Sequence, residues 1–383
     1  MPDIILCNVN SCTQCQACVQ ACPKACITMV EAKDGFSVPY IDTARCINCG
    51  ICMKACHVIS DARSYNRPLK TYACWTASKY DREKSSSGGA FSILARNILS
   101  MGGVVFGAYM NKELQVHHIW IDNVDDLYKL QGSKYVQSCL NNTYRDVRKF
   151  LLEGKPVLFT GTPCQVSGLL CFLRKSYENL YTCDIICHGV PSQKSFDTYT
   201  NKIGIRENSS DVSFRYTKGW GFQMAYVDSR SHKRKILSPY KAYYFRAFNA
   251  GLMTSEACYS CLYSRVERVS DVTIADYWGI GRMGSFDYPI QRGISLLLVN
   301  RGRIEPLLNE SKDLMKVERP LQEAINGNYN LTHPTQRPEG RDSYYMDAQN
   351  LSIKELIKKY SIVASCKDYL RIVKQVVFSC IRR

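Results

Sequence analysis

The sequence predicts an α+β fold in which a short cysteine-rich module precedes a larger α/β core. Residues 12–56 contain two runs of the form CxxCxxCxxxC, and from Thr71 strand-like and helix-like segments alternate to about residue 300. Alternation of this kind is typical of a sheet that is covered by helices. A chain of 383 residues is also long enough for more than one domain.

The two cysteine runs read CTQCQACVQAC and CINCGICMKAC. Each iron of a 4Fe–4S cubane takes one terminal thiolate, and the fourth cysteine of such a run ligates the other cluster. The spacing therefore predicts a two-cluster 4Fe–4S ferredoxin domain over residues 1–66. One cluster is assigned Cys12, Cys15, Cys18 and Cys56, and the other is assigned Cys46, Cys49, Cys52 and Cys22.

Two alternatives for these cysteines are weak. A disulfide framework needs an oxidising compartment, whereas the start MPDIILCNVN has neither a basic region nor a long apolar run, so we expect a cytoplasmic protein. Zinc ribbons use two CxxC pairs instead of two longer runs. Pro23 follows the first run but His57 follows the second, and we expect this histidine to leave its cluster more exposed to water.

The formal charge of +16 raises the question of nucleic-acid binding. Thiolate-bound 4Fe–4S clusters carry about −2 each, which lowers the total, and the basic residues are dispersed. We therefore expect no nucleic-acid partner. The dense run RSHKRK at residues 230–235 is interpreted as a solvated hairpin loop, with docking of acidic redox partners or cofactors as the alternative.

Three parts are expected behind the ferredoxin domain, at residues 71–154, 155–330 and 331–383. Strands are predicted at 4–6 and 36–41 in the first module, and then at 71–78, 102–110, 116–122, 155–160, 182–187, 212–217, 224–229, 272–279 and 294–300. Helices are predicted at 85–103, 124–130, 144–154, 166–176, 195–203 and 240–252. The last part is expected to be a linker and a basic amphipathic helix over 351–383. We expect this helix to pack on the core or on a partner, with contact to a membrane surface as the less favoured alternative.

Twelve cysteines lie outside the two runs, and four of them stand at element ends among Gly, Pro and His, where ligands usually lie. A CxxC pair with two single cysteines can close one four-thiolate site, for zinc or for a third 4Fe–4S cluster, and the spacing does not choose between them. A buried cysteine is also often only a small apolar residue. The four candidates are Cys164, Cys187, Cys258 and Cys261.

A glycine-rich loop and a second polar segment are candidates for binding a phosphate-bearing cofactor. The pyrophosphate of FAD prefers free backbone N–H groups at a Gly-rich helix start. The candidates are Ser86, Ser87, Gly88 and Gly89 at the start of the helical segment 85–103, and Ser133, Lys134, Tyr135 and Gln137 in the second segment. Alternatively, the first segment is only an ordinary helix cap, and Lys134 is only a surface lysine. The run GIGRMG at 279–284 is not followed by a helical pattern, so it is not interpreted as a dinucleotide fingerprint.

Several motifs stand in a fixed order behind the ferredoxin domain: KSSSGGAFS, GGVVFGA, GSKYVQS, VLFTGTPCQVSGL, CDIICHGVPS and CYSCLYSRVERVSDVTIADYWGI. Over residues 1–310 the chain resembles the coenzyme F-420 hydrogenase/dehydrogenase beta-subunit family, in the bacterial form with an N-terminal 2×(4Fe–4S) ferredoxin domain. The resemblance implies a flavin, FAD, in the core and an additional 4Fe–4S cluster. On that analogy the ligands of this cluster are Cys164, Cys187, Cys258 and Cys261.

The expected function is an iron–sulfur flavoprotein oxidoreductase that passes electrons between 4Fe–4S clusters and an organic hydride acceptor. Its partner would be a redox protein or a small electron carrier. The alternative is a non-catalytic electron-transfer subunit of a larger redox complex. Neither the hydride acceptor nor the use of a deazaflavin follows from the sequence. His188 is a candidate proton donor beside the flavin, with a hydrogen bond to cluster sulfur or backbone as the alternative role.

Overall fold

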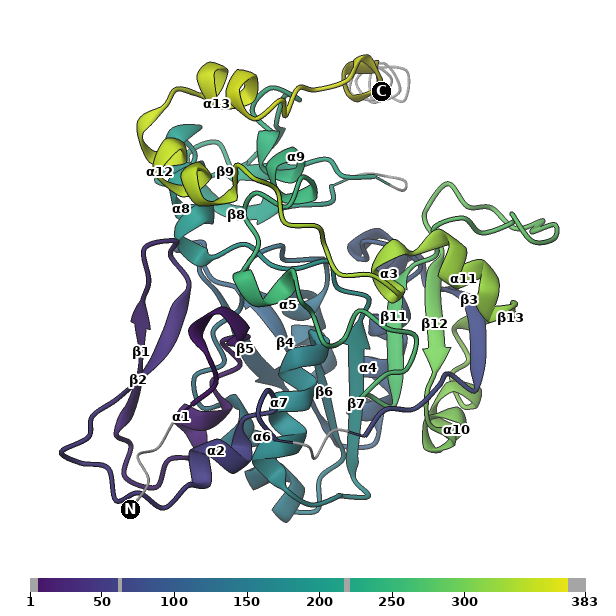
Figure 1. Cartoon of the computed structure of the whole chain (residues 1–383). Coiled ribbons are helices and arrows are strands. Elements are labelled where there is room, and N and C mark those ends of the chain that lie inside the picture. The colour runs from purple at the N-terminus through teal and green to yellow at the C-terminus, as the bar shows by residue number, and fades with distance from the viewer. Residues whose placement is uncertain (1–5, 61–63, 217–220, 371–383) are drawn as a thin grey trace.

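The computed structural model describes residues 6–60, 64–216 and 221–370. The small N-terminal module consists of two short helices beside a two-stranded antiparallel sheet, and it lies at the lower left of Figure 1. The predicted strand at 36–41 is present as β2, whereas the strand predicted at 4–6 falls mainly on residues 1–5, outside the described residues. The module contains η1 (Val9–Ser11), α1 (Ala17–Ala21), β1 (Ile27–Glu31), β2 (Ser37–Ile41) and α2 (Ile51–Ala55).

An eight-stranded mixed sheet forms the core, with the strand order β13-β3-β12-β11-β7-β6-β4-β5. The four strands β4, β6, β7 and β11 run parallel, and antiparallel strands extend the sheet on both sides. Its strands come from both sides of residue 154. They are β3 (Lys70–Thr76), β4 (Val104–Met110), β5 (Val116–Ile121), β6 (Val157–Gly161), β7 (Leu180–Ile185), β11 (Val272–Asp276), β12 (Ser295–Val299) and β13 (Leu314–Glu318).

Helices cover both faces of this sheet, because alternate residues of its central strands point to opposite sides. Phe106 and Phe159 join a buried cluster with α6 (Thr143–Leu152) and α7 (Pro163–Leu173). Val105 and Leu158 join another with α4 (Ala90–Ser100) and α10 (Glu305–Asn309). The N-terminal module packs through α1 and α2 against α7, so it adjoins the sheet on the α6–α7 side (Figure 1).

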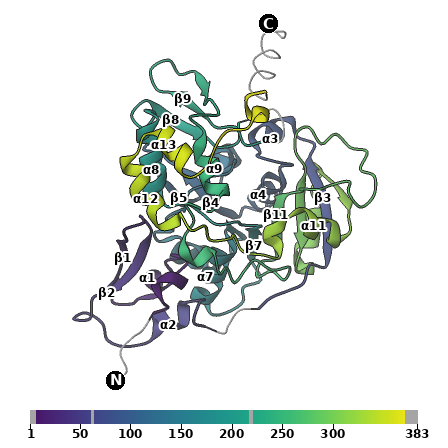
Figure 2. The same ribbon diagram turned by 45° about the horizontal axis from the view of Figure 1, so that its top comes forward.

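A third layer lies above the sheet in Figure 1 and at the upper left of Figure 2, and it combines segments that are far apart in the sequence. Phe196, Tyr244, Tyr344 and Leu356 share its buried core. The segment from residue 331, expected to be a linker and a tail, thus contributes two helices to this layer. The layer consists of α8 (Gln193–Lys202), β8 (Ser209–Ser213), β9 (Ala225–Asp228), β10 (Arg234–Ile236), α9 (Tyr243–Asn249), α12 (Arg341–Asn350) and α13 (Ile353–Lys359).

The remaining elements are short. The end of the predicted C-terminal helix, residues 371–383, lies outside the described residues. Among the residues that the structure describes, none of the helices is both long enough and apolar enough to cross a membrane. The short elements are α3 (Lys79–Lys84), η2 (Val124–Asp126), α5 (Leu127–Leu130), η3 (Glu256–Cys258), η4 (Gly302–Ile304), α11 (Leu321–Gly327) and η5 (Tyr329–Leu331).

The glycine run at 279–284 forms a loop and not the start of a helix, as its sequence predicts. The amides of Gly281 and Met283 both donate to Glu323 Oε1, at 2.9 and 3.0 Å. Glu323 in turn pairs with Arg319 at 2.8 Å. A carboxylate of the chain itself therefore occupies this loop.

Candidate functional site

A cavity of about 640 Å³ lies at the carboxyl ends of the parallel strands. Thr160 and Gly161 of β6, Ile185 of β7 and Asp276 of β11 all border it. Ligands in open α/β sheets bind outside this edge, where loops converge. Pockets that enclose a ligand usually have volumes of about 300–1,000 Å³, so the size is suitable for a cofactor.

The start of α4 forms one wall of the cavity. Of the four residues that the sequence suggests for cofactor binding in this loop, Ser86, Ser87 and Gly89 border the cavity and Gly88 does not. No side chain caps α4, and among the described residues the amides of residues 87–91 donate no hydrogen bond. Such free N–H groups, at the positive end of the helix dipole, fit the phosphates of a dinucleotide cofactor.

The two glycines before α4 are required by the fold. A Cβ on Gly88 would lie 2.2 Å from the carbonyl oxygen of Cys74 and 2.5 Å from the amide nitrogen of Ser295. Gly89 adopts φ +93° and forms the N-cap of α4. The loop is thus pressed against β3 and β12, which fixes the position of the helix start.

The second polar segment is joined to this loop and to the N-terminal module. Ser86 Oγ accepts hydrogen bonds from the amide and the hydroxyl of Ser133, both at 2.9 Å. Gln137 Nε2 donates to the carbonyl oxygen of Thr13 at 3.1 Å. Ser133, Lys134, Tyr135 and Gln137 all border the cavity. The segment therefore spans the space between the helix start and the cysteine-rich module.

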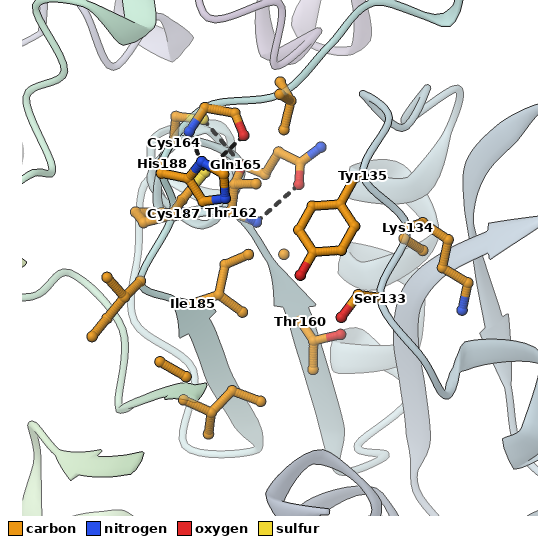
Figure 3. A pocket seen from close by; sticks show the side chains of 18 of the residues that line it. Ser133, Lys134, Tyr135, Thr160, Thr162, Cys164, Gln165, Ile185, Cys187 and His188 are labelled. Carbon is orange, nitrogen blue, oxygen red and sulfur yellow. Dashed lines mark hydrogen bonds between the residues drawn. The ribbon is translucent and has the colours of Figure 1, made fainter. Parts of the chain in front are cut away.

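Lys134 and Tyr135 point in different directions. Lys134 Nζ donates to the carbonyl oxygens of Lys129 (3.1 Å) and Gln131 (2.8 Å), and in Figure 3 this side chain extends away from Tyr135. Burial lowers the pKa of the Lys134 ammonium to about 7. The Tyr135 ring lies among aromatic side chains, with Phe245 at 5.0 Å between ring centroids. The ring of Tyr135, and not the ammonium of Lys134, is therefore presented to the cavity.

A buried ion pair lines another part of the cavity, and the sequence analysis did not single it out. Arg215 Nη1 lies 2.5 Å from Asp276 Oδ2, and the two side chains are only 4% and 10% exposed. The guanidinium stands 4.7 Å from the centre of the Phe222 ring, which stacks on Trp278 at 5.9 Å. Asp276 and Trp278 lie at the end of β11 within the motif VTIADYWGI, whereas Arg215 comes from a loop far away in the sequence.

The four cysteines predicted as a third metal site all border the same cavity. Cys164 begins α7, Cys187 follows β7, and the pair Cys258 and Cys261 lies at the end of η3 and in the loop after it. Burial, together with the charges of neighbouring cysteines of the set, raises the pKa of the thiol to about 11 for Cys164 and to about 12 for Cys187. Thiolates that are held together in such an environment fit a metal centre.

Hydrogen bonds to sulfur also fit an iron–sulfur centre. The amide of Gly189 donates to Cys187 Sγ, and that of Tyr263 donates to Cys261 Sγ, both at 3.4 Å. Thr162 Oγ1 lies 3.1 Å from Cys164 Sγ. Such bonds tune the potential of iron–sulfur clusters. Among the described residues, no group of three or more His, Cys, Asp or Glu side chains is placed to bind one single metal ion. In a 4Fe–4S cubane each cysteine binds a different iron, so its ligands do not need to meet at one point.

One buried arginine holds together two of the segments that carry these cysteines. Arg268 Nη2 lies 3.1 Å from Asp184 Oδ1, and the two side chains are 1% and 0% exposed. Arg268 Nη2 also donates to the carbonyl oxygen of Ile185 (3.0 Å), and its Nη1 donates to that of Tyr263 (2.9 Å). Ile185 precedes Cys187 and Tyr263 follows Cys261, so Arg268 fixes both segments.

The eight cysteines of the two runs form two groups in space. Cys15 is buried near Cys12, and the half-buried Cys18 lies near both Cys12 and Cys56. Burial, followed by the charges of Cys12 and Cys56, raises the pKa of Cys18 to about 12. The second group, around a shallow hollow in the surface, consists of Cys22, Cys46, Cys49 and Cys52.

The two runs have the same backbone turns. Gln14 and Gln16 flank Cys15 with φ values of +54° and +58°, and Asn48 and Gly50 flank Cys49 with +52° and +69°. Left-handed residues on both sides of the middle cysteine wrap each loop around a common centre. Two further cysteines stand beside the groups and were not assigned from the sequence: Cys26 Sγ lies 3.4 Å from Cys22 Sγ, and hydrogen bonds with Cys12 and Cys56 raise the pKa of Cys7.

The expectation that His57 exposes its cluster to water is wrong. His57 is 0% exposed, with Nε2 2.8 Å from Thr13 Oγ1 and Nδ1 2.6 Å from the hydroxyl oxygen of Tyr263. The histidine is therefore part of the contact between the N-terminal module and the loop of Cys261. The sequence around Cys56 shows that a histidine replaces the proline, but it does not show that the segment of Tyr263 covers this histidine.

Helix α7 brings the N-terminal module next to the third cysteine set. Its second residue is Cys164, and one turn later a Cβ on Gly168 would lie 3.0 Å from Cys15 Sγ. Cys164 is also among the charges that raise the pKa of Cys15, after burial and closer groups. The three cysteine groups thus form a continuous series that ends at the cavity.

Two histidines border the cavity in neutral surroundings. His118 Nε2 lies 2.9 Å from the carbonyl oxygen of Thr160, to which it donates, and its Nδ1 lies 2.8 Å from Ser138 Oγ. Burial lowers the pKa of His118 to about 4. His188 stacks on Phe248 at 4.4 Å between ring centroids, and burial lowers its pKa to about 4 as well.

Two family models match separate regions of the chain. Residues 11–59 match the family model of the 4Fe-4S dicluster domain, and residues 154–321 match that of the C terminus of the beta subunit of coenzyme F420 hydrogenase/dehydrogenase. No curated protein matches the chain. One similar solved chain comes from the F420-reducing [NiFe] hydrogenase complex from Methanosarcina barkeri; it is 15% identical, with a TM-score of 0.46, over 77% of this chain and 91% of that chain.

The dicluster domain makes this chain an iron–sulfur electron-transfer protein. Its fold is a mixed α+β fold with an N-terminal 4Fe–4S module and an α/β sheet core, as predicted. Both matched regions agree with the family that the sequence motifs resemble. The chain therefore combines an N-terminal 4Fe–4S dicluster domain with a region, residues 154–321, that matches the C terminus of the coenzyme F420 hydrogenase/dehydrogenase beta subunit.

Proposed function

We propose that this protein is an iron–sulfur flavoprotein oxidoreductase that passes electrons between its 4Fe–4S clusters and an organic hydride acceptor through FAD. The observation that carries the proposal is that one cavity is bordered by four clustered cysteines and by the uncapped start of α4. Clusters move single electrons, and a bound flavin exchanges one or two and can pass a pair as a hydride.

The start of α4 and the segment 131–138 would hold the FAD. The amides of residues 87–91 supply donors for the pyrophosphate, and the hydrogen bonds between Ser86 and Ser133 keep the two segments at a fixed separation. The ring of Tyr135 offers a flat apolar contact beside them. Lys134, held by two carbonyl oxygens, fixes the conformation of the segment.

Cys164, Cys187, Cys258 and Cys261 would ligate a third 4Fe–4S cluster between the ferredoxin domain and this cofactor. Their shared position on one cavity, the N–H donors on two of the sulfurs, and the nearness of Cys15 support this assignment. Arg268 would keep two of the ligand segments in place without touching the sulfur atoms.

The part of the cavity near β11 would receive the organic acceptor. Trp278 and Phe222 give it an aromatic wall, and the ion pair between Arg215 and Asp276 supplies polar groups with fixed positions. Aromatic side chains with a few fixed polar groups are typical of sites for small organic molecules. His188, stacked on Phe248, lies beside the cysteine set and holds no charge at neutral pH.

A second candidate is a non-catalytic electron-transfer subunit of a larger redox complex. The description of the matching family as a beta subunit favours it. Stopped-flow reduction of the isolated protein separates the two candidates. A stand-alone enzyme reduces an organic acceptor by itself, whereas a subunit becomes reduced but passes electrons only to its partner.

Anaerobic purification with iron counting and a visible spectrum tests the proposal. We expect about 12 iron atoms and one FAD per chain. A preparation with about 8 irons and no flavin would contradict both the third cluster and the flavin site, while it would leave the dicluster domain intact.

A further inference from the structure

The two cysteine groups of the ferredoxin domain differ in their access to solvent. Cys12, Cys15 and Cys56 of the inner group are each 8% exposed. Cys18 of the inner group and Cys46 of the outer group are half-buried, and Cys22 and Cys52 of the outer group are buried. Of these eight cysteines, Cys49 in the outer group is the one that is exposed. An external electron donor or acceptor can therefore come closest to this domain's clusters at the outer group.

Two exposed apolar side chains lie next to cysteines of the outer group in the sequence, and one of them, Ile47, borders the hollow of this group. Ile47 is 55% exposed and Met53 is 37% exposed, and both lie in the run that carries Cys46, Cys49 and Cys52. This run leads into α2 at the lower end of the N-terminal module in Figure 1. Apolar side chains that gather at the surface around a redox group indicate a contact surface for a partner.

The rim of this surface is positively charged. Lys24, Arg45, Lys54 and Arg174 are exposed, and none of them forms an ion pair with a described residue. Arg45 Nη2 donates to the carbonyl oxygen of Lys24 at 3.1 Å, and Arg174 Nη2 donates to that of Ile51 at 3.3 Å, which fixes both guanidinium groups beside the cysteine loops.

No carboxylate balances this charge within the loops themselves. Residues 22–26 and 45–54 contain neither Asp nor Glu. Asp42, which precedes the second run, accepts a hydrogen bond from the amide of Ala44 at 3.1 Å. A partner that presents carboxylates around its own redox group would complement this rim and be steered towards it.

We infer that the surface formed by Lys24, Arg45, Ile47, Met53 and Lys54 is the docking site for a small acidic iron–sulfur carrier protein. One electron passes between the carrier's cluster and the outer cluster, so the oxidation of one balances the reduction of the other. A second copy of this chain would oppose like charges across the contact. The inference depends on the dicluster domain alone and holds whether or not the cavity binds a flavin.

The test uses the full-length protein with its clusters and a small acidic 2Fe–2S ferredoxin as the probe. The variant Lys24→Glu/Lys54→Glu reverses two charges without removing a hydrogen bond from a described side chain. We expect the affinity of the variant for the ferredoxin to fall by about tenfold or more at low salt. The rate of electron transfer from the ferredoxin to the variant should fall by the same factor. The control variant Arg230→Glu/Lys233→Glu, on the β9–β10 loop, should leave both unchanged.

Iron content and the visible spectrum show whether the clusters remain intact in each variant. If the first variant loses iron, the single variant Lys54→Glu replaces it. Binding of the wild-type protein is then also measured against salt, because raising the ionic strength from about 0.01 M to about 1 M shortens the Debye length from about 30 to about 3 Å. The inference is overturned if binding does not depend on salt, if the control variant weakens it equally, or if duplex DNA binds the same surface as tightly as the ferredoxin.

Discussion

His57 Nδ1 lies 2.6 Å from the hydroxyl oxygen of Tyr263, so the residue after Cys56 is joined directly to the loop that carries Cys261. The other ring nitrogen of His57 lies 2.8 Å from Thr13 Oγ1. One buried imidazole thereby links both cysteine runs of the ferredoxin domain to the core. A proline at this position, as after the first run, would provide no such link.

Tyr263→Phe should weaken this contact without changing the cluster ligands. Loss of one hydrogen bond to a buried group costs about 1–3 kcal/mol, so we expect a lower midpoint of thermal unfolding and faster limited proteolysis around residue 60. The iron content should stay unchanged. Tyr329→Phe, at a ring that is 52% exposed, is the control. Equal stability of the two variants would show that the contact contributes nothing measurable.

Arg268→Leu should destabilise the protein strongly, because it leaves Asp184 buried without its partner. Breaking a buried ion pair by removing one side costs about 3–5 kcal/mol. Burial already raises the pKa of Asp184, which agrees with an apolar site. Denaturant unfolding measures the change, and a variant that still folds should lose about 4 irons.

Arg265→Leu is the matched control for that experiment. Arg265 pairs with Glu267 at 3.1 Å, but their side chains are 47% and 35% exposed. Exposed pairs contribute about 0–1 kcal/mol. Similar losses in both variants would mean that Arg268 has no special role in holding the cysteine segments.

Cysteine substitutions should separate ligands from neighbours. Cys258→Ser should lower the iron content by about 4 atoms and leave the spectrum of the ferredoxin clusters unchanged. Cys171→Ser, on the buried side of α7, and Cys7→Ser, beside the inner group, should keep the full iron content. Loss of all iron in the Cys258 variant would show that the third site and the ferredoxin domain form together.

Ser86→Asp should prevent flavin binding while the protein stays folded. A carboxylate before α4 interacts favourably with the helix dipole, by about 0.3–1 kcal/mol, but it repels the phosphates of FAD. We expect a preparation with normal iron content and no flavin absorbance. Ser100→Asp, at the other end of α4, should retain the flavin. A Ser86 variant that binds flavin normally would exclude this helix start as the phosphate site.

The free energy of unfolding should decrease when the pH is lowered, because of His118. Its pKa is about 4 in the fold and about 6.5 in the unfolded chain, so between these values only the unfolded state binds the proton. Stability is complete above about pH 6.5 and decreases towards pH 4, by about 1.4 kcal/mol for each pH unit within this window.

Urea unfolding at pH 7.0 and at about pH 5.5 measures this dependence, and His118→Asn should reduce it by about 1 kcal/mol over that range. His232→Asn, in the exposed loop after β9, serves as the control. An unchanged slope in the His118 variant would show that other groups cause the loss of stability.

Local sequence patterns predicted the parts of the site that depend on short-range spacing. The two cysteine runs, the helix start after Gly89 and the strand before Thr160 all lie where their residue order places them. Arg268, Arg215 and His57 act through partners that are 61 to 206 residues away in the sequence. Such contacts exist only once the sheet has assembled, so no local pattern contains them.

Gly168 also has a consequence for the separation between the N-terminal module and the cavity. It follows Cys164 by four residues on α7 and lies against Cys15, so about 6 Å of helix rise separates the two cysteine positions along one axis. The packing of the N-terminal module against this one turn of α7 therefore sets the separation of the two cysteines. A side chain in place of the Gly168 hydrogen would push Cys15 away from α7 and lengthen that separation without touching the cavity.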